Sequence, residues 1–329
     1  MTAPRAGEFD LIARYFAPIA GPGGLGLIDD AAVLTPPQGC DLVLSKDALV
    51  AGIHFFPDDP AETIACKALR VNLSDLAAKG ARPLGFLLGL GLPADWTDPW
   101  LAAFARGLGQ DAARFGCPLL GGDTVSSPER LMLSVTVLGA VPVGTMVRRA
   151  GGQAGDLLYV SGVIGAAALG LQGRLPAPPA WATSLPPAVA AAARAAYLLP
   201  APSLMLAEAV RTHASAAMDV SDGLIGDARK LANASGTGVE IDARRVPLLA
   251  GLEPAARLDP ALLACCLTGG DDYQVLAAVP PARALSFEAA AEEAGARVTA
   301  IGRLTAEAPR VLGPDGGEMT FSRPSYGHF

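Results

Sequence analysis

The chain has 329 residues and a mass of 33.3 kDa. Hydrophobic residues make up 51% of it and charged residues 17%, which excludes a disordered protein and favours a globular protein of about two domains. The formal charge of −7 argues against nucleic acid or an anionic membrane as a partner, because no basic stripe is available to neutralise phosphates.

The distribution of charge and cysteine predicts a cytoplasmic protein. Residues 1–16 carry charges throughout, unlike the apolar core of a signal peptide. The uncharged stretches 131–147 and 175–193 contain prolines, so neither would cross a bilayer as a helix of about 20 apolar residues. The five cysteines are odd in number and include no CxxC pair, which indicates a reducing compartment.

The first half of the chain alternates short apolar runs with Ala- and Leu-rich stretches, which is typical of an α/β protein. Strands are predicted over residues 41–45, 86–92, 118–120 and 131–138. Helices are predicted over residues 8–16, 63–79 and 99–115. We expect Asp98 to be the N-cap of the last helix, with Pro99 at its first position.

Near residue 143 the sequence changes to a connector that contains glycine and arginine. We therefore expect an N-terminal domain over 1–142 and a C-terminal domain over 143–329. In the second half, strands are predicted over 157–160, 239–242, 274–278 and 297–301. Helices are predicted over 187–198, 202–212 and 224–234, and the Pro/Ala-rich segment 175–187 is expected to be a surface excursion.

Aspartates recur beside small residues in both halves. Asn-Leu-Ser-Asp (72–75) is followed by Gly-Gly-Asp (121–123), and Asp-Val-Ser-Asp (219–222) by Gly-Gly-Asp (269–271), at nearly the same separation. Most of these aspartates, and Asp47, are predicted at strand ends or in tight loops, where α/β proteins bind ligands. One hypothesis is that both halves aim carboxylates from equivalent places at a shared site; the other is chance, because Gly and Asp are common in loops.

Carboxylates that converge without bases repel one another, and a hard divalent cation such as Mg²⁺ removes that repulsion. The chain has no GxxxxGK[ST] loop, no GxSxG elbow and no Cys/His spacing typical of zinc. Phosphoryl transfer fits this inventory, since it depends on positioning and charge stabilisation more than on a nucleophile. Arg149 is the basic residue that would lie against a transferred phosphate, or else a solvated connector charge.

Eight segments resemble the thiamine-monophosphate kinase family. They are LIDDAAVL (27–34), SKDALVAGIHF (45–55), KALRVNLSDLAAKGARP (67–83), GGDT (121–124), RRAGGQAGD (148–156), MDVSDGL (218–224), GGDDYQV (269–275) and SYGHF (325–329). NLSDLAA, SDG and GGD are also similar to a wider superfamily that includes aminoimidazole ribonucleotide synthetase and selenophosphate synthetase. KDALVAGIHF and the closing SYGHF narrow the resemblance to the thiamine enzymes.

This resemblance implies ATP-dependent phosphorylation of thiamine monophosphate to thiamine diphosphate. The implied fold is α/β (α+β): an N-terminal domain whose mixed sheet pairs with that of a second subunit in a homodimer, and a C-terminal α/β domain that closes the active-site cleft. The ligands implied for several Mg²⁺ ions are Asp30, Ser45, Asp47, Asp75, Asp123, Asp219 and Asp222. The contacts implied for ATP are Gly122, Asp123, Arg149 and Ser221, and those implied for thiamine monophosphate are His54, Asp271 and Tyr326.

No side chain is expected to act as a nucleophile or base. The sequence departs from the family where Lys46 replaces a hydroxyl ligand, Asp271 a glutamate and Ala105 an aromatic residue. Two alternatives stay open. The motifs shared with the superfamily allow another of its ATP-dependent synthetases, and Lys46 and Ala105 allow a non-catalytic protein that binds nucleotide or thiamine phosphate.

Overall fold

The computed structural model describes residues 7–252, 255–256 and 259–327. The chain divides into two compact units, Met1–Leu73 with Arg82–Gly144, and Ser74–Ala81 with Thr145–Phe329. One boundary therefore follows Gly144, and another falls inside helix α2 (Ala61–Ala78), which the sequence did not indicate. Across the residues described, no helix has the length and apolar character needed to span a membrane.

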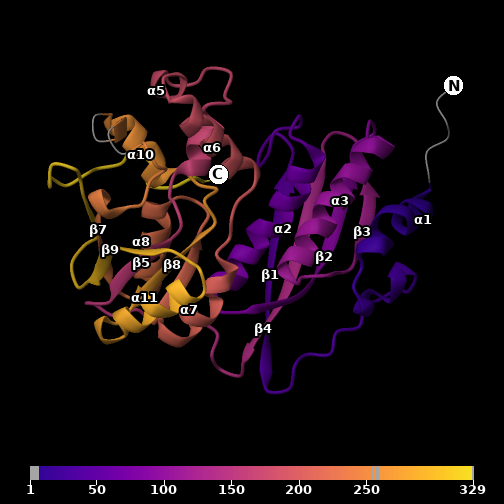
Figure 1. Cartoon of the computed structure of the whole chain (residues 1–329), viewed down its shortest axis with the longest axis horizontal. Coiled ribbons are helices and arrows are strands. Elements are labelled where there is room, and N and C mark those ends of the chain that lie inside the picture. The colour runs from indigo at the N-terminus through magenta and orange to yellow at the C-terminus, as the bar shows by residue number, and fades with distance from the viewer. Residues whose placement is uncertain (1–6, 253–254, 257–258, 328–329) are drawn as a thin grey trace. The chain divides into compact units, whose positions relative to one another are not determined.

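The first unit contains a mixed four-stranded sheet in the order β1-β4-β2-β3. Its strands are β1 (Cys40–Val50), β2 (Arg82–Leu92), β3 (Leu119–Ser126) and β4 (Met132–Pro142). β4 runs antiparallel to both β1 and β2, and β3 is parallel to β2. Helices α2 and α3 (Asp98–Phe115) cover one face of this sheet (Figure 1).

The helix-facing side of the sheet forms the apolar core of this unit, because side chains alternate between the two faces of each strand. Phe86, Leu133 and Val135 are fully buried, whereas Leu44 and Leu87 lie on the other face and are 62% and 38% exposed. The result is a sheet with one face covered by helices and one open face, on which exposed apolar side chains are mixed with polar ones.

Helix α3 begins one residue earlier than the sequence predicts. Thr97 is the N-cap, since its side chain accepts a hydrogen bond from the backbone N–H of Trp100. Asp98 is instead the first helical residue, and its carboxylate accepts a hydrogen bond from the hydroxyl of Tyr15 at 2.8 Å. The predicted N-cap was therefore wrong. The helix ends at Gly116, whose left-handed backbone (φ 59°) suits glycine.

The second unit contains a mixed six-stranded sheet in the order β10-β7-β9-β5-β8-β6. Its strands are β5 (Leu157–Ser161), β6 (Ala216–Val220), β7 (Gly238–Asp242), β8 (Gln274–Val279), β9 (Val298–Thr305) and β10 (Arg310–Leu312). Its helices include α4 (Ala166–Gln172), α5 (Ala180–Thr183), α6 (Pro187–Leu198), α7 (Ala207–His213), α8 (Leu224–Ala234), α10 (Pro260–Thr268) and α11 (Ala284–Glu293).

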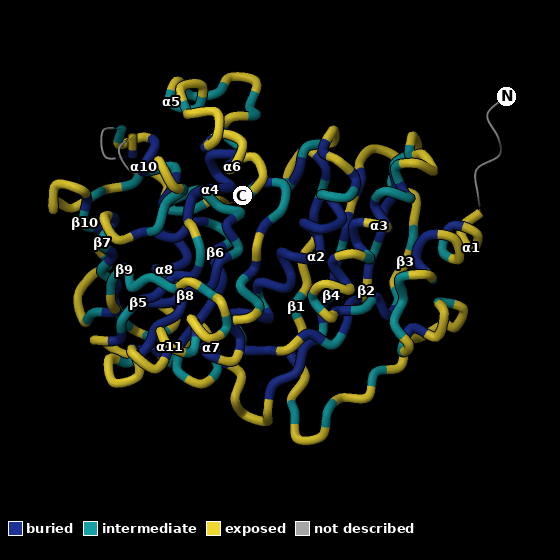
Figure 2. The backbone as a smooth tube through the Cα atoms, in the orientation of Figure 1, coloured by how far each residue is buried: buried dark blue, intermediate teal, exposed yellow. Residues whose placement is uncertain are grey.

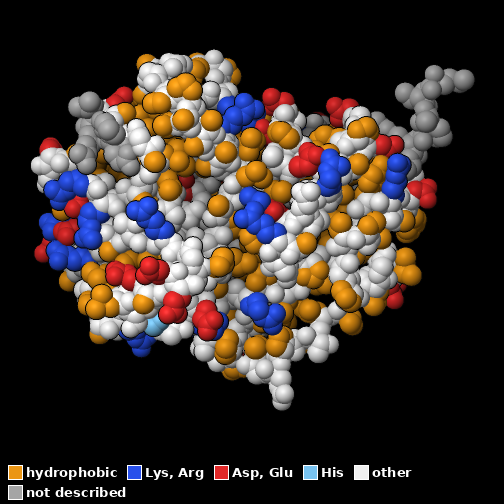
Figure 3. All heavy atoms as spheres, in the orientation of Figure 1, with side chains coloured by type: hydrophobic (Ala, Val, Ile, Leu, Met, Phe, Trp, Pro, Cys, Tyr) orange, Lys and Arg blue, Asp and Glu red, His pale blue; other side chains and the backbone are white. Residues whose placement is uncertain are grey.

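Both faces of this second sheet are buried. Leu158, Val160 and Met218 pack into one apolar cluster together with α8 and α10, while Tyr159 and Val275 pack into another with α7 and α11. The strands β5, β6 and β8 are accordingly mostly dark blue in Figure 2. At the edge the sheet turns polar: Glu240 pairs with Arg303 at 3.0 Å and with Arg310, and Figure 3 shows the charged side chains gathered there.

Several predicted elements are confirmed and others are corrected. The helices predicted over 187–198 and 224–234 have the observed bounds of α6 and α8. The helix predicted over 8–16 is an α-helical turn, α1 (Glu8–Leu11), followed by a π-helical turn, Ile12–Phe16. The five cysteines are free thiols, and burial raises the pKa of Cys66 and of Cys117 to about 12, so both behave as small apolar side chains.

A buried ion pair joins the two helices of the first unit. Arg70 on α2 donates from Nε to Asp111 Oδ2 at 2.5 Å and from Nη2 to Asp111 Oδ1 at 2.9 Å, and only 9% and 4% of the two side chains is exposed. This bidentate geometry satisfies both charges away from water.

Replacing Asp111 with alanine leaves the buried guanidinium without its acceptor, so we expect the free energy of unfolding to fall by about 3–5 kcal/mol. Urea denaturation measures this loss. The matched control is Arg70→Met with Asp111→Leu, which removes both charges and is expected to cost much less. Equal losses in the two variants would contradict the explanation.

Candidate functional site

Two predicted metal ligands lie on β1. Ser45 and Asp47 face Val137 and Val135 of β4 in register, and the backbone N–H of Asp47 donates to the Asn72 side chain at 3.0 Å. The sequence predicts that Asp47 closes a strand, but the strand continues for three more residues to Val50. That prediction was wrong, because the residues from Ala48 to Val50 continue the antiparallel pairing with β4.

Asp123 is also inside a strand rather than after one. It lies in β3, opposite Gly89 of β2, and follows Gly122. A Cβ added to Gly122 would lie 1.9 Å from the carbonyl oxygen of Leu88, so only glycine allows the two strands to approach here. Asp123, Gly122 and Asp30 line one pocket of about 770 Å³ over the open face of the sheet.

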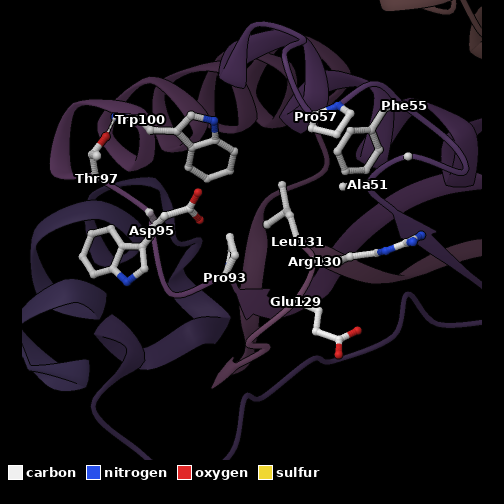
Figure 4. Close-up of a pocket in the computed structure, with 12 residues that line it drawn as sticks. Ala51, Phe55, Pro57, Pro93, Asp95, Thr97, Trp100, Glu129, Arg130 and Leu131 are labelled. Carbon is white, nitrogen blue, oxygen red and sulfur yellow. Dashed lines mark hydrogen bonds between the residues drawn. The ribbon is translucent and has the colours of Figure 1, made fainter.

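His54 follows β1 in a tight loop and is turned back on its own backbone. Its Nδ1 accepts a hydrogen bond from the backbone N–H of Val50 at 3.0 Å, which places the ring proton on Nε2 when the imidazole is neutral. Its neighbours Gly52 and Phe55 line a second pocket, of about 560 Å³. Figure 4 shows the rings of Phe55 and Trp100 on two sides of this pocket.

In the second unit, Asp75 and Asp219 lie close to Lys79. Asp75 is on the C-terminal part of α2, and Asp219, on β6, accepts a hydrogen bond from the hydroxyl of Ser74 at 2.7 Å. The pKa of Lys79 is lowered, first by burial and then by Arg149, while the charges of Asp219 and Asp75 oppose that shift. The structure therefore brings both predicted carboxylates and the predicted phosphate-binding arginine close to one lysine.

The loop that carries Ser221 and Asp222 lies over a buried carboxylate. The backbone N–H groups of both residues donate to Asp227 Oδ2, at 3.0 Å and 2.9 Å, and Lys230 Nζ donates to Asp227 Oδ1 at 2.8 Å and to Asp222 Oδ2 at 2.5 Å. Burial raises the pKa of Asp227, although Lys230 opposes the shift. Burial lowers the pKa of Lys230, but its bonds to the two carboxylates outweigh that effect and raise it.

The second Gly-Gly-Asp motif packs directly against this loop. The backbone N–H of Asp271 donates to the carbonyl of Ser221 at 2.9 Å, and a Cβ on Gly270 would lie 2.3 Å from that same carbonyl oxygen. Asp271 and Tyr273 have positive φ angles of 72° and 51°, and the Tyr273 hydroxyl donates to Asp271 Oδ1 at 3.0 Å. Such backbone strain in non-glycine residues clusters at functional sites.

The C-terminal tail also contacts the loop of Ser221 and Asp222. Tyr326 donates its backbone N–H to the carbonyl of Asp222 at 2.9 Å and keeps 53% of its surface exposed. Gly226, on α8, is in van der Waals contact with the tail, since a Cβ there would lie 2.2 Å from the Cβ of Ser325. Of the predicted SYGHF motif, residues 328 and 329 lie outside the described residues.

The two repeated motifs do not occupy equivalent local structures. Residues 72–75 lie within α2, whereas residues 219–222 end a strand; the first Gly-Gly-Asp lies within β3, whereas the second precedes β8. The hypothesis of equivalent places is therefore wrong at the level of secondary structure. Among the described residues, no three His, Cys, Asp or Glu side chains come together closely enough to hold a metal ion.

Comparison with known proteins identifies the family. Residues 28–141 match the N-terminal domain model of AIR synthase related proteins, and residues 153–312 match the C-terminal one. The curated thiamine-monophosphate kinase of Caulobacter vibrioides is 43% identical over 300 residues, or 90% of this chain and 83% of the relative. That of Escherichia coli (strain K12) is 38% identical over 336 residues, or 98% of each. The chain belongs to the thiamine-monophosphate kinase family.

Solved structures of this family have the same fold. The thiamine-monophosphate kinase of Stenotrophomonas maltophilia superposes with a TM-score of 0.77 at 37% identity, covering 87% of this chain and 90% of that one. AaThiL, complexed with AMPPCP and TMP, superposes with a TM-score of 0.74 at 28% identity and covers both chains completely. The fold predicted from the resemblance, with two domains and mixed sheets, is thereby confirmed.

The structure adds residues that the sequence analysis of this family member missed. Asp227, Lys230 and Tyr273 each contact a predicted site residue, yet none was singled out. A signal for Asp227 was present, since an acidic residue in the first turn of a helix commonly binds backbone N–H groups before it. The i, i+3 spacing of Asp227 and Lys230 within the predicted helix was a signal for their ion pair, but nothing in the sequence indicates the bond from Lys230 to Asp222.

The contact between Gly270 and Ser221 yields a direct prediction. Gly270→Ala places a methyl group against the Ser221 carbonyl and forces the two loops apart, so we expect a loss of about 1–3 kcal/mol in the free energy of unfolding. Thermal and urea unfolding measure it. Gly173→Ala is the matched control, because a Cβ there meets nothing nearer than 3.5 Å. A loss as large in the control as at Gly270 would contradict the packing argument.

Proposed function

We propose that this protein transfers the terminal phosphoryl group of ATP to thiamine monophosphate, which gives thiamine diphosphate and ADP. The observation that carries the proposal is the match over the whole chain to AaThiL, which was solved with AMPPCP and TMP. Curated relatives at 37–43% identity are named thiamine-monophosphate kinase. We propose the cytoplasm as its compartment.

The predicted ligands suit Mg²⁺ by their chemistry. All seven offer carboxylate or hydroxyl oxygens, and none offers sulfur or imidazole, which is the donor set that magnesium prefers. In the first unit they are Asp30, Ser45, Asp47 and Asp123, and in the second Asp75, Asp219 and Asp222. When bound, Mg²⁺ neutralises phosphate charge and polarises the transferred group.

The remaining predicted residues are proposed to orient the two substrates. Arg149 would balance phosphate charge, and Gly122 lines the pocket of about 770 Å³ in which part of a nucleotide would lie. Ser221 is proposed as a further ATP contact. We assign His54, Asp271 and Tyr326 to thiamine monophosphate. The exposed ring of Tyr326 suits stacking on a flat heteroaromatic cation, and the aromatic pocket beside His54 offers apolar walls.

Two other functions remain to be separated by experiment. A synthetase of the same superfamily would also release ADP, but only with a different acceptor. A non-catalytic binding protein would bind nucleotide without turnover. HypE, a hydrogenase maturation protein solved with ATP, shares the fold at 20% identity, and that similarity shows the fold alone.

We also propose a homodimer formed through the open face of the first unit's sheet. This face exposes a group of large apolar side chains: Leu42, Leu44, Leu87, Val125 and Met132. Several exposed large apolar side chains on one sheet face are typical of an interface between subunits. The family resemblance implies the same pairing of sheets.

Purified protein with ATP, Mg²⁺ and thiamine monophosphate is expected to give thiamine diphosphate and ADP in equal amounts, which chromatography of the products measures. Asp75→Asn is expected to lower turnover more than about a hundredfold, because it removes a ligand charge at constant size. Glu293→Gln, on the exposed face of α11, is the matched control and should retain full activity. Nucleotide binding without any product would favour the non-catalytic alternative.

The dimer makes a separate prediction. Leu44→Glu places a charge on the open sheet face and is expected to give a monomer in light scattering or analytical ultracentrifugation, whereas the unmodified protein gives twice the chain mass. Leu285→Glu is the control, since Leu285 is 81% exposed on α11, which belongs to the other unit. A monomeric mass for the unmodified chain at micromolar concentration would contradict the proposed dimer.

A further inference from the structure

One ammonium group is shared between two carboxylates of very different exposure. Lys230 Nζ lies 2.5 Å from Asp222 Oδ2 and 2.8 Å from Asp227 Oδ1. The Asp222 side chain is 37% exposed, whereas that of Asp227 is completely buried. All three residues belong to the loop after β6 and to helix α8, so their positions are set within one compact unit.

The two bonds of Lys230 are therefore not equivalent. Asp227 is fixed, because its other oxygen receives the backbone N–H groups of Ser221 and Asp222, and a buried charge of this kind needs a cation beside it. Asp222 is half-exposed, and in the part of the chain that the structure describes its carboxylate binds no donor other than Lys230. The bond to Asp227 is structural, whereas the bond to Asp222 is open to exchange.

We propose that Lys230 acts as an internal cation on Asp222 that competes with the divalent metal, and so sets the metal affinity of this carboxylate. The inference rests on the proposed role of Asp222 as a metal ligand. An ammonium group and a divalent ion on the same carboxylate repel each other, so metal binding requires Lys230 to withdraw from Asp222. Lys230 retains Asp227 as a partner when it does so.

If Lys230 instead orients Asp222 for the metal, removing Lys230 changes the metal affinity in the opposite direction. Groups that hydrogen-bond to a ligating carboxylate commonly orient it, and their removal weakens metal binding. If Lys230 only orients Asp222, its loss will weaken the binding of metal. If Lys230 competes for Asp222, its loss will strengthen it. The sign of the change in metal affinity therefore decides between the two roles.

The test measures Mn²⁺ binding to the full chain in the presence of AMPPCP, with free Mn²⁺ followed by its electron paramagnetic resonance signal. Asp222→Asn shows which Mn²⁺ site depends on this carboxylate, because binding at that site is lost or weakened in the variant. Lys230→Met is expected to tighten binding at the same site about tenfold, with a smaller Kd. This readout needs no turnover, so it is independent of whether thiamine monophosphate is the substrate.

Three variants separate competition at Asp222 from general electrostatics. Arg229→Met removes a charge one residue away, about 100° around the helix, and should leave the Kd within about twofold. Lys230→Met with Asp227→Asn keeps the local net charge and the loop's acceptor oxygen, and should still tighten binding; it also serves if Lys230→Met alone fails to fold. In the Asp222→Asn background, Lys230→Met should have no effect on affinity.

The proposal is overturned by any of three results. One is unchanged or weaker Mn²⁺ binding in both variants that lack Lys230. Another is an equal gain in Arg229→Met, which would assign the effect to overall charge. The third is an Asp222→Asn variant with unaltered Mn²⁺ binding, which would remove Asp222 from the ligand set. Failure of the product assay, with these affinities as expected, would instead count against the proposed substrate alone.

Discussion

The buried carboxylate of Asp227 is the constraint on which the second unit's part of the site depends. It receives two backbone N–H groups from the loop above it and the ammonium of Lys230 from its own helix. With that loop fixed, Ser221 offers a carbonyl to the loop of Asp271, and Asp222 offers one to the tail at Tyr326. The loop of Ser221 and Asp222, the loop of Asp271 and the tail at Tyr326 are thus positioned through the buried carboxylate of Asp227. Removing the partners of this desolvated group would cost much free energy.

A protein that gathers carboxylates for metal also has to fold and remain stable before the metal arrives. In the second unit, hydrogen-bond donors of the protein itself bind the carboxylates of the predicted site when no metal is present. Ser74 donates to Asp219, Lys230 to Asp222 and Tyr273 to Asp271. Two of these donors are neutral hydroxyls, which bind a carboxylate without cancelling its charge. Of these three donors, Lys230 is the one that carries a positive charge, and we therefore single it out as a competitor for metal.

The sequence predicted the parts of the fold that local physics determines. Helices α6 and α8 have clear first and last residues, and the motif segments identified the family from one chain. Strand lengths were underestimated because Asp47 and Asp123 lie within strands whose polar side chains interrupt the apolar pattern. Helix α10 was missed, since Leu262, Cys266 and their neighbours are apolar nearly all round and leave no periodic face. The bond from Lys230 to Asp227 is an i, i+3 pair within α8, which the spacing could have indicated, whereas its bond to Asp222 depends on the turn between β6 and α8.

The backbone around the second Gly-Gly-Asp motif shows how the fold holds a strained site. Asp271 and Tyr273 both adopt left-handed conformations, each of which costs about 1–3 kcal/mol in a non-glycine residue. Such strain persists only where surrounding contacts determine the backbone. Here the N–H groups of the same two residues donate to Ser221 and Val220, and buried Asp272 between them accepts the N–H of Gly165 at 2.8 Å. The strain and the hydrogen bonds together hold the side chain of Asp271 against the hydroxyl of Tyr273.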